Sequence, residues 1–165
     1  DKLRQNTDLR WIIIGDGRQR EWLVQKIKEY RLDNAIYLLG QHPVDSMPMY
    51  FSMADALLVT LKRDKIFELT IPSKIQSYLA CGRPILGALD GEGANIINDS
   101  GAGYAVPAGD AEALANAVLK MYQSTEEERT QMGLNGRKYY EQHFDRELLF
   151  GRLEDIMKAA IEENS

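Results

Sequence analysis

Apolar runs and amphipathic stretches alternate along most of the chain. Residues 9–14 form a β-branched run that Gly15 ends, so we predict a strand that is buried on both faces. Residues 19–31 follow with apolar side chains at helical spacing, and residues 35–39 form a second predicted strand that Gly40 ends. Further strands are predicted at 56–60, 84–89 and 104–106, and further helices at 47–54, within 72–84, from Glu92 onward, and at 111–122, 126–143 and 147–161.

Strands and helices that alternate through short loops predict an α/β fold in which helices cover both faces of a parallel sheet. We expect one domain over residues 1–165, because this length suits a single core. Residues 1–8 are mostly polar and resemble the end of a helix whose preceding strand is missing. Either the fold starts there or the chain is a fragment without its first strand.

Composition and charge narrow the classes of partner. The net charge is −5, and basic residues are scattered among acidic ones, which disfavours nucleic acid as a partner. The single cysteine, Cys81, excludes an internal disulfide and is expected to be buried. Without a membrane-spanning run or a leader segment, the chain is expected to be cytoplasmic.

Ligands of parallel α/β sheets bind at the carboxyl ends of the strands, so the loops after Ile14, Leu39, Thr60, Leu89 and Val106 are the candidate site. The first of these loops reads Gly15-Asp16-Gly17-Arg18, which looks like the start of a dinucleotide-binding fingerprint. Arg20 stands where that fingerprint needs its third glycine, so a plain tight turn or a phosphate-facing loop fits better.

The segment Pro72-Ser73-Lys74 opens a predicted helix after the long loop of residues 61–71. Free N–H groups at a helix start bind anions, and Lys74 adds a positive charge where the helix dipole is already positive. Two interpretations stay open at this point: Lys74 points into water, or it faces a bound anion such as a phosphate.

Two other loops carry candidate polar groups. In Asp90-Gly91-Glu92-Gly93, Glu92 could accept hydrogen bonds from sugar hydroxyls or could simply favour the start of a helix. In Gly40-Gln41-His42-Pro43, His42 has no carboxylate partner in the sequence, but the loop backbone could line a pocket for a base. We find no metal-ligand spacing, no nucleophile elbow and no P-loop.

Several of these segments occur in the order found in a known family. The chain resembles the C-terminal domain of family 4 (group 1) glycosyltransferases of GT-B fold, and it is most similar to the branch that builds capsular polysaccharide and O-antigen. The resemblance covers nearly the whole chain, and its most specific part is P-S-K-I-Q-S-Y-L-A-C-G-R-P at 72–84. It is also carried by G-D-G at 15–17, I-Y-L-L-G at 36–40, G-E-G at 91–93 and Y-Y-E-Q-H-F at 139–144.

The resemblance implies a Rossmann-like domain that binds a nucleotide-sugar donor, with UDP as the nucleotide guessed by analogy. It implies retaining transfer of a hexosyl or N-acetylhexosaminyl group without a metal or other cofactor. Lys74 and the helix start at Pro72 and Ser73 would meet the diphosphate, and Lys74 would be the catalytic residue. The loop of Gly40, Gln41 and His42 would hold the base. Donor-binding residues would further include Gly15, Asp16, Gly17, Arg18, Ser77 and Glu92.

The chain departs from the family pattern at the ribose contact. Many members have two glutamates with seven residues between them, and here those positions are Leu69 and Ser77. Glu68 and Gln76 keep the separation but are shifted by one residue, which is about 100° on a helix. Ser77 could bind a ribose hydroxyl more weakly than a carboxylate would.

The resemblance also implies partners. An absent N-terminal half would bind an acceptor, usually a lipid-linked sugar, at the inner membrane face, so the isolated domain is expected to be inactive alone. A C-terminal helix over 145–163 could dock on that half, or its exposed apolar residues could drive self-association. A non-catalytic nucleotide-sugar-binding module and a nucleotide-sugar epimerase are the alternative functions, and only His42, Glu68 and Glu92 would serve an epimerase as acid or base.

Overall fold

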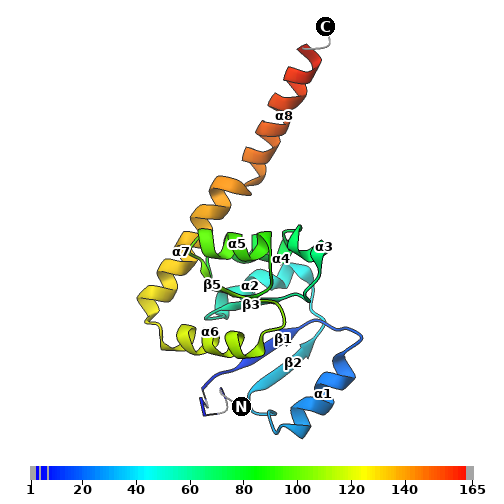
Figure 1. Ribbon diagram of the computed structural model, residues 1–165, viewed down its shortest axis with the longest axis vertical. Helices are drawn as coiled ribbons and strands as arrows, with labels where there is room; N and C mark the ends of the chain where they lie inside the picture. Colours follow the sequence, from blue (N-terminus) through cyan, green and yellow to red (C-terminus); the bar gives the residue numbers. More distant parts are fainter. Residues whose placement is uncertain (1–2, 4, 7, 163–165) are drawn as a thin grey trace. The chain divides into compact units, whose positions relative to one another are not determined.

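The structure is a computed structural model that describes residues 3, 5, 6 and 8–162, and its elements are shown in Figure 1. The chain divides into two compact units, residues 1–50 and 51–165, and each is described by itself. The predicted single domain over residues 1–165 therefore stays a prediction.

The first unit is built on two parallel strands. Strand β1 (Trp11–Ile14) pairs with β2 (Ile36–Gly40), and helix α1 (Arg20–Glu29) connects them. The 3-10 helix η1 (Val44–Ser46) and the start of α2 (Met47–Met53) follow. Ile12 and Ile13 are exposed, so the prediction that this strand is buried on both faces is wrong for β1. Its β-branched residues favour the strand conformation, but other residues do not bury both faces of the strand.

The second unit contains three parallel strands in the order β3 (Leu57–Thr60), β4 (Ile85–Ala88) and β5 (Gly103–Val106). Helices α4 (Ser73–Ala80), α5 (Glu92–Asp99) and α6 (Ala111–Gln123) connect or follow these strands and pack against them. Figure 1 shows α6 on the side of the sheet opposite to α4 and α5. Parallel pairing and helices on both faces confirm the predicted α/β class in this unit.

The core of the second unit lies between the sheet and helices α4 and α5. The central strand β4 is buried along its whole length, which explains its continuous apolar run. Ile75 and Leu79, one helical turn apart on α4, are fully buried against it. Helix α7 (Glu126–His143) packs on α4, and α8 (Arg146–Glu162) follows it.

Two further details correct the sequence predictions. The segment 61–71, predicted as a loop, contains the short helix α3 (Lys65–Glu68), which Asp64 caps by accepting the N–H of Ile66. Cys81 is half-buried, because it lies at the end of α4 and not within it. On α8, the apolar residues expected to be exposed are Leu148, Leu149, Phe150, Leu153, Ile156 and Met157. Five of these six are exposed, and Leu148 is half-buried.

Candidate functional site

In the first unit, the loop after β1 begins beside the last residue of β2. The N–H of Gly15 donates to the carbonyl oxygen of Gly40 at 2.6 Å, next to an irregularity in the strand register. Asp16 accepts the N–H of Gly17 at 2.8 Å, and its carboxylate lies 3.8 Å from the Arg20 guanidinium. The Asp16 side chain therefore stabilises the turn. Arg18 is exposed and has no ion-pair partner among the described residues.

The loop after β2 orients its histidine through an aromatic neighbour. Nδ1 of His42 lies 3.0 Å from the hydroxyl of Tyr50, and the two rings meet edge to face with centroids 5.0 Å apart. This contact fixes the ring plane and occupies one of its two nitrogens. Gln41 and His42 are both exposed, so the loop presents polar groups to solvent at the carboxyl end of β2.

In the second unit, α4 begins at Ser73 with Pro72 at its N-cap. The N–H of Ile75 donates to Pro72 at 2.9 Å, whereas those of Ser73 and Lys74 have no acceptor within the described part of the chain. The Lys74 side chain is exposed, and its ammonium forms no ion pair or hydrogen bond with any described residue. Two free N–H groups and one ammonium therefore stand together at a positive helix end.

The start of α5 lies directly beside the start of α4. A methyl group added at Gly93 would come within 3.3 Å of Cδ of Pro72 and within 3.0 Å of the Ile75 side chain. Gly91 is the N-cap of α5, and Glu92, predicted to bind the donor, is the first residue of the helix and is exposed. Close packing at Gly93 therefore brings two positive helix ends to one place at the carboxyl edge of the sheet.

Capping distinguishes these helix starts from others in the chain. Asp64, Asp110 and Thr125 cap α3, α6 and α7 with their side chains. No described side chain caps α1, α4 or α5, each of which begins at or just after a predicted donor-binding segment. Uncapped N–H groups need another acceptor, which is water or an anionic ligand.

Ser77 lies one turn into α4 and is exposed. Its hydroxyl donates to the carbonyl oxygen of Ser73 at 3.2 Å, so its proton is already used inside the helix. Toward a ligand the Ser77 oxygen is left as an acceptor.

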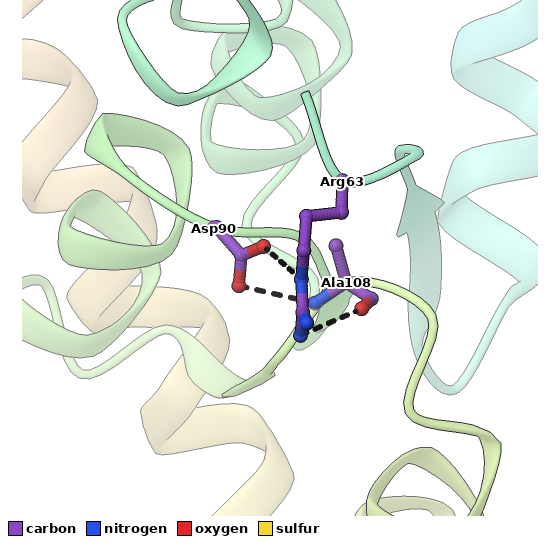
Figure 2. Close-up of polar contacts among 3 residues, drawn as sticks. All are labelled: Arg63, Asp90 and Ala108. Atoms are coloured by element: carbon purple, nitrogen blue, oxygen red, sulfur yellow. Dashed lines mark hydrogen bonds and ion pairs between the residues drawn. The ribbon is translucent and has the colours of Figure 1, made fainter. Parts of the chain in front are cut away.

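A polar cluster that the sequence analysis missed ties together the loops after β3, β4 and β5 (Figure 2). Nε of Arg63 lies 3.5 Å from Oδ2 of Asp90, and Nη2 of Arg63 donates to the carbonyl oxygen of Ala108 at 3.3 Å. Oδ1 of Asp90 accepts the N–H of Ala108 at 3.1 Å. The position of Asp90 directly after a predicted strand could have indicated a functional role for its carboxylate. Ala108 could not have been found in the same way, because it takes part through its backbone and its side chain carries no polar group.

Two groups near the far end of α4 have shifted proton affinities. Burial raises the pKa of the Tyr78 hydroxyl, with a smaller contribution from Cys81. Burial also raises the pKa of the Cys81 thiol, and Arg137 and Arg83 partly offset that rise. Neither group lies at the carboxyl edge of the sheet, so neither belongs to the candidate site.

The structure therefore gathers the predicted residues into two groups, one in each unit. Gly15 to Arg18 and Gly40 to His42 lie together in the first unit, and Pro72 to Lys74, Ser77 and Glu92 lie in the second. That all of them line one site stays a prediction. Among the described residues, no three His, Cys, Asp or Glu side chains cluster to hold a metal ion, and no described helix could span a membrane.

Comparison with known proteins gives a consistent family. The model of the family "Glycosyl transferases group 1" matches residues 1–124. Amylovoran biosynthesis glycosyltransferase AmsK of Erwinia amylovora is 25% identical over 149 residues, which cover 90% of this chain and 36% of that protein. N-acetyl-alpha-D-glucosaminyl L-malate synthase of Bacillus anthracis is 22% identical over 155 residues, covering 94% of this chain and 39% of that protein.

Solved structures agree on the fold. HepE of Anabaena, solved in complex with UDP, superposes with a TM-score of 0.80 at 18% identity, covering 92% of this chain and 41% of that one. The GT-B glycosyltransferase fold implied by the sequence resemblance is thus confirmed. This chain spans about two fifths of the length of these relatives. Because the family model matches residues 1–124, well over half of the sequence, the chain belongs to the group 1 glycosyltransferases.

Proposed function

We propose that this chain is the donor-binding part of a retaining glycosyltransferase that takes a UDP-sugar. The observation that carries the proposal is the paired start of α4 and α5, where uncapped N–H groups meet the unpartnered ammonium of Lys74. Support for the nucleotide comes from HepE, which was solved with UDP and with UDP-glucose.

Departure of the nucleoside diphosphate leaves negative charge on its outer phosphate. Donors already aimed at that charge lower the barrier, because they need not reorganise as the charge develops. In this proposal the N–H groups of Ser73 and Lys74 bind the diphosphate, and the Lys74 ammonium stabilises it as it leaves. No metal ion or other cofactor takes part.

The base and the ribose are assigned to other loops. The exposed backbone of Gly40 and Gln41 would hold the base, and Ser77 would accept a ribose hydroxyl. The turn from Gly15 to Arg18 would lie near the phosphates or the sugar, with Arg18 as its free cation. Hexosyl or N-acetylhexosaminyl transfer follows from the family resemblance.

The acceptor belongs to a second half in this proposal, since relatives are more than twice as long as this chain. That half would bind a lipid-linked or saccharide acceptor at the inner membrane face, so this chain alone would not catalyse transfer. Helix α8 would dock on that half and would otherwise drive self-association through its exposed apolar residues. Family membership favours a transferase over an epimerase or a non-catalytic module.

Calorimetric titration of the 165-residue chain with UDP and UDP-glucose tests the proposal. Lys74 is exposed, so its attraction to a phosphate about 4 Å away is worth about 1 kcal/mol in a water-like dielectric and more as the site closes. We therefore expect Lys74→Ala to weaken UDP binding about fivefold or more without lowering the unfolding temperature.

Lys138→Ala is the matched control, because Lys138 is exposed on α7 and has no partner among the described residues. It removes the same charge next to Arg137, which donates to the carbonyl oxygen of Ala80 at the opposite end of α4, and should leave UDP affinity unchanged. Equal affinities for wild type and Lys74→Ala would refute the assignment of Lys74. A wild-type chain that binds neither UDP nor UDP-glucose would refute the proposed donor.

A further inference from the structure

The β3–α4 loop, residues 61–72, lies at the carboxyl edge of the sheet, and beyond Leu61, which packs against the core, residues 62–71 contain no buried side chain. Its helix α3 has no buried residue. Ile66 and Leu69 are 69% and 81% exposed, so their side chains contribute little to docking. Polar contacts or close backbone packing must therefore fix the position of this loop.

Arg63 supplies the polar contact. Its guanidinium uses Nε on the carboxylate of Asp90 and Nη2 on the carbonyl oxygen of Ala108, while Asp90 also accepts the Ala108 N–H (Figure 2). The three contacts form a closed ring that joins the ends of β3, β4 and β5. The planar fork of arginine suits this role, because one side chain reaches two acceptors in fixed directions.

Close backbone packing at Gly91, the residue after Asp90, supplies a second contact with the loop. Gly91, next to Asp90, packs so tightly on the end of α3 that an added Cβ would lie 2.0 Å from the carbonyl oxygen of Glu68. The loop is therefore held on the β4–α5 segment both before α3, at Arg63, and at its end, at Glu68. It then leads directly into Pro72 and the uncapped start of α4.

We propose that Arg63 and Asp90 are positioning residues that lock the β3–α4 loop beside the starts of α4 and α5. This inference rests on the proposed function, since the locked loop borders the place assigned to the diphosphate. Locking the loop in advance removes part of the entropy cost that the donor would otherwise meet on binding. Neither residue needs to touch the donor for this effect.

If Arg63 bound the phosphates directly, the Asp90→Asn variant would have the opposite effect on UDP affinity. The Arg63 side chain is 68% exposed, whereas that of Asp90 is 27% exposed, so arginine released from the ring could turn toward an anion. If Arg63 bound the phosphates itself, Asp90→Asn would free it and leave UDP affinity equal or higher. If the ring acts by positioning, Asp90→Asn weakens UDP binding just as Arg63→Ala does.

The experiment uses the 165-residue chain in two assays, amide hydrogen exchange by mass spectrometry and calorimetric titration with UDP. The amides of Phe67 and Glu68 bond to Asp64 and report opening of the loop. An exposed ion pair is worth a modest amount, so Arg63→Ala and Asp90→Asn should each speed exchange there about two- to fivefold. The double variant should add nothing further, and Arg63→Lys should restore part of the protection.

UDP affinity should fall by a similar factor in both single variants and in the double variant, because all three lose the same ring. Exchange in β5 should stay at the wild-type rate. Lys62→Ala is the matched control: it removes a neighbouring exposed charge with no partner among the described residues, and it should change neither readout.

Unchanged exchange at Phe67 and Glu68 in both single variants would overturn the proposal. Weaker UDP binding in Arg63→Ala together with equal or tighter binding in Asp90→Asn would also overturn it and would make Arg63 a direct ligand of the phosphates. A wild-type chain that does not bind UDP would refute the proposed function, and the exchange data would still decide whether the ring locks the loop.

Discussion

Replacing Gly91 with alanine tests whether the β4–α5 loop packs on α3 as described. Gly91 has φ 70° and ψ −146°, a region open essentially to glycine alone. Alanine there costs about 1–3 kcal/mol in backbone strain before any contact is counted. The added methyl group would also lie 2.0 Å from the carbonyl oxygen and 2.4 Å from the Cα of Glu68. These are backbone atoms, which cannot rotate away as a side chain would.

Overpacking of this kind typically costs a further ~1–3 kcal/mol. Gly109→Ala is the reference variant that carries the backbone strain without the overpacking, because Gly109 also has a positive φ, 79°, but no described atom lies within 4 Å of its added Cβ. Urea unfolding followed by circular dichroism measures both variants. We expect Gly91→Ala to lose about 1–3 kcal/mol more stability than Gly109→Ala, with similar slopes.

The free energy with which the β3–α4 loop docks is an upper limit on the overpacking cost of Gly91→Ala. Since α3 buries no side chain, the chain can relieve the clash by letting the loop move away, and the loss then equals the free energy of loop docking. Fast exchange at Phe67 and Glu68 in Gly91→Ala would identify this outcome. Equal destabilisation by the two alanine variants, with the exchange at Phe67 and Glu68 unchanged, would refute the packing of Gly91 on Glu68.

Three further predictions concern the rest of the second unit. Gly133→Ala should destabilise the chain by about 1–3 kcal/mol in urea unfolding, because its Cβ would lie 2.1 Å from the Gly82 carbonyl oxygen where α7 packs on α4; a neutral or stabilising effect would contradict this packing. Burial raises the pKa of the Cys81 thiol, so its thiolate forms only at higher pH than usual. The rate of alkylation by iodoacetamide should therefore reach half its maximum above pH ~8.5, the ordinary value for a cysteine. A midpoint at or below that pH would contradict the burial of the thiol. Ile156→Glu on the exposed face of α8 should reduce self-association in sedimentation velocity, since Ile156 is 66% exposed and loses no internal packing; an unchanged sedimentation coefficient would exclude this face from the contact.

Local patterns predicted the order and type of the elements well, but they did not predict what covers them. Strand β4 has a continuous apolar run and is fully buried. Strand β1 has three consecutive isoleucines, yet Ile12 and Ile13 are exposed, because burial depends on neighbours that a single segment does not encode. Helix α3 was missed because four residues carry too short a pattern, and only the Asp64 cap marks its start.

The candidate site shows the same division between local and distant information. The helix start at Pro72 and its free N–H groups follow from residues adjacent in sequence, so they could be predicted. The ring of Arg63, Asp90 and Ala108 joins three loops that are separated by whole strands and helices, and one of its members acts through its backbone alone. Only the parallel arrangement of β3, β4 and β5, with their carboxyl ends side by side, brings those groups together.

The predicted ribose contact is where local chemistry and family pattern disagree most. A glutamate one turn into α4 would present two acceptor oxygens with a full charge, whereas Ser77 presents one oxygen and already donates its proton to Ser73. A ribose hydroxyl held by Ser77 would therefore be bound by a single neutral hydrogen bond, worth roughly half of a charge-assisted one. Under the proposed function, donor affinity would then rest more heavily on the diphosphate. The free N–H groups at the starts of α4 and α5 and Lys74 would supply that affinity, so the position of the neighbouring β3–α4 loop would matter more here than where a glutamate holds the ribose.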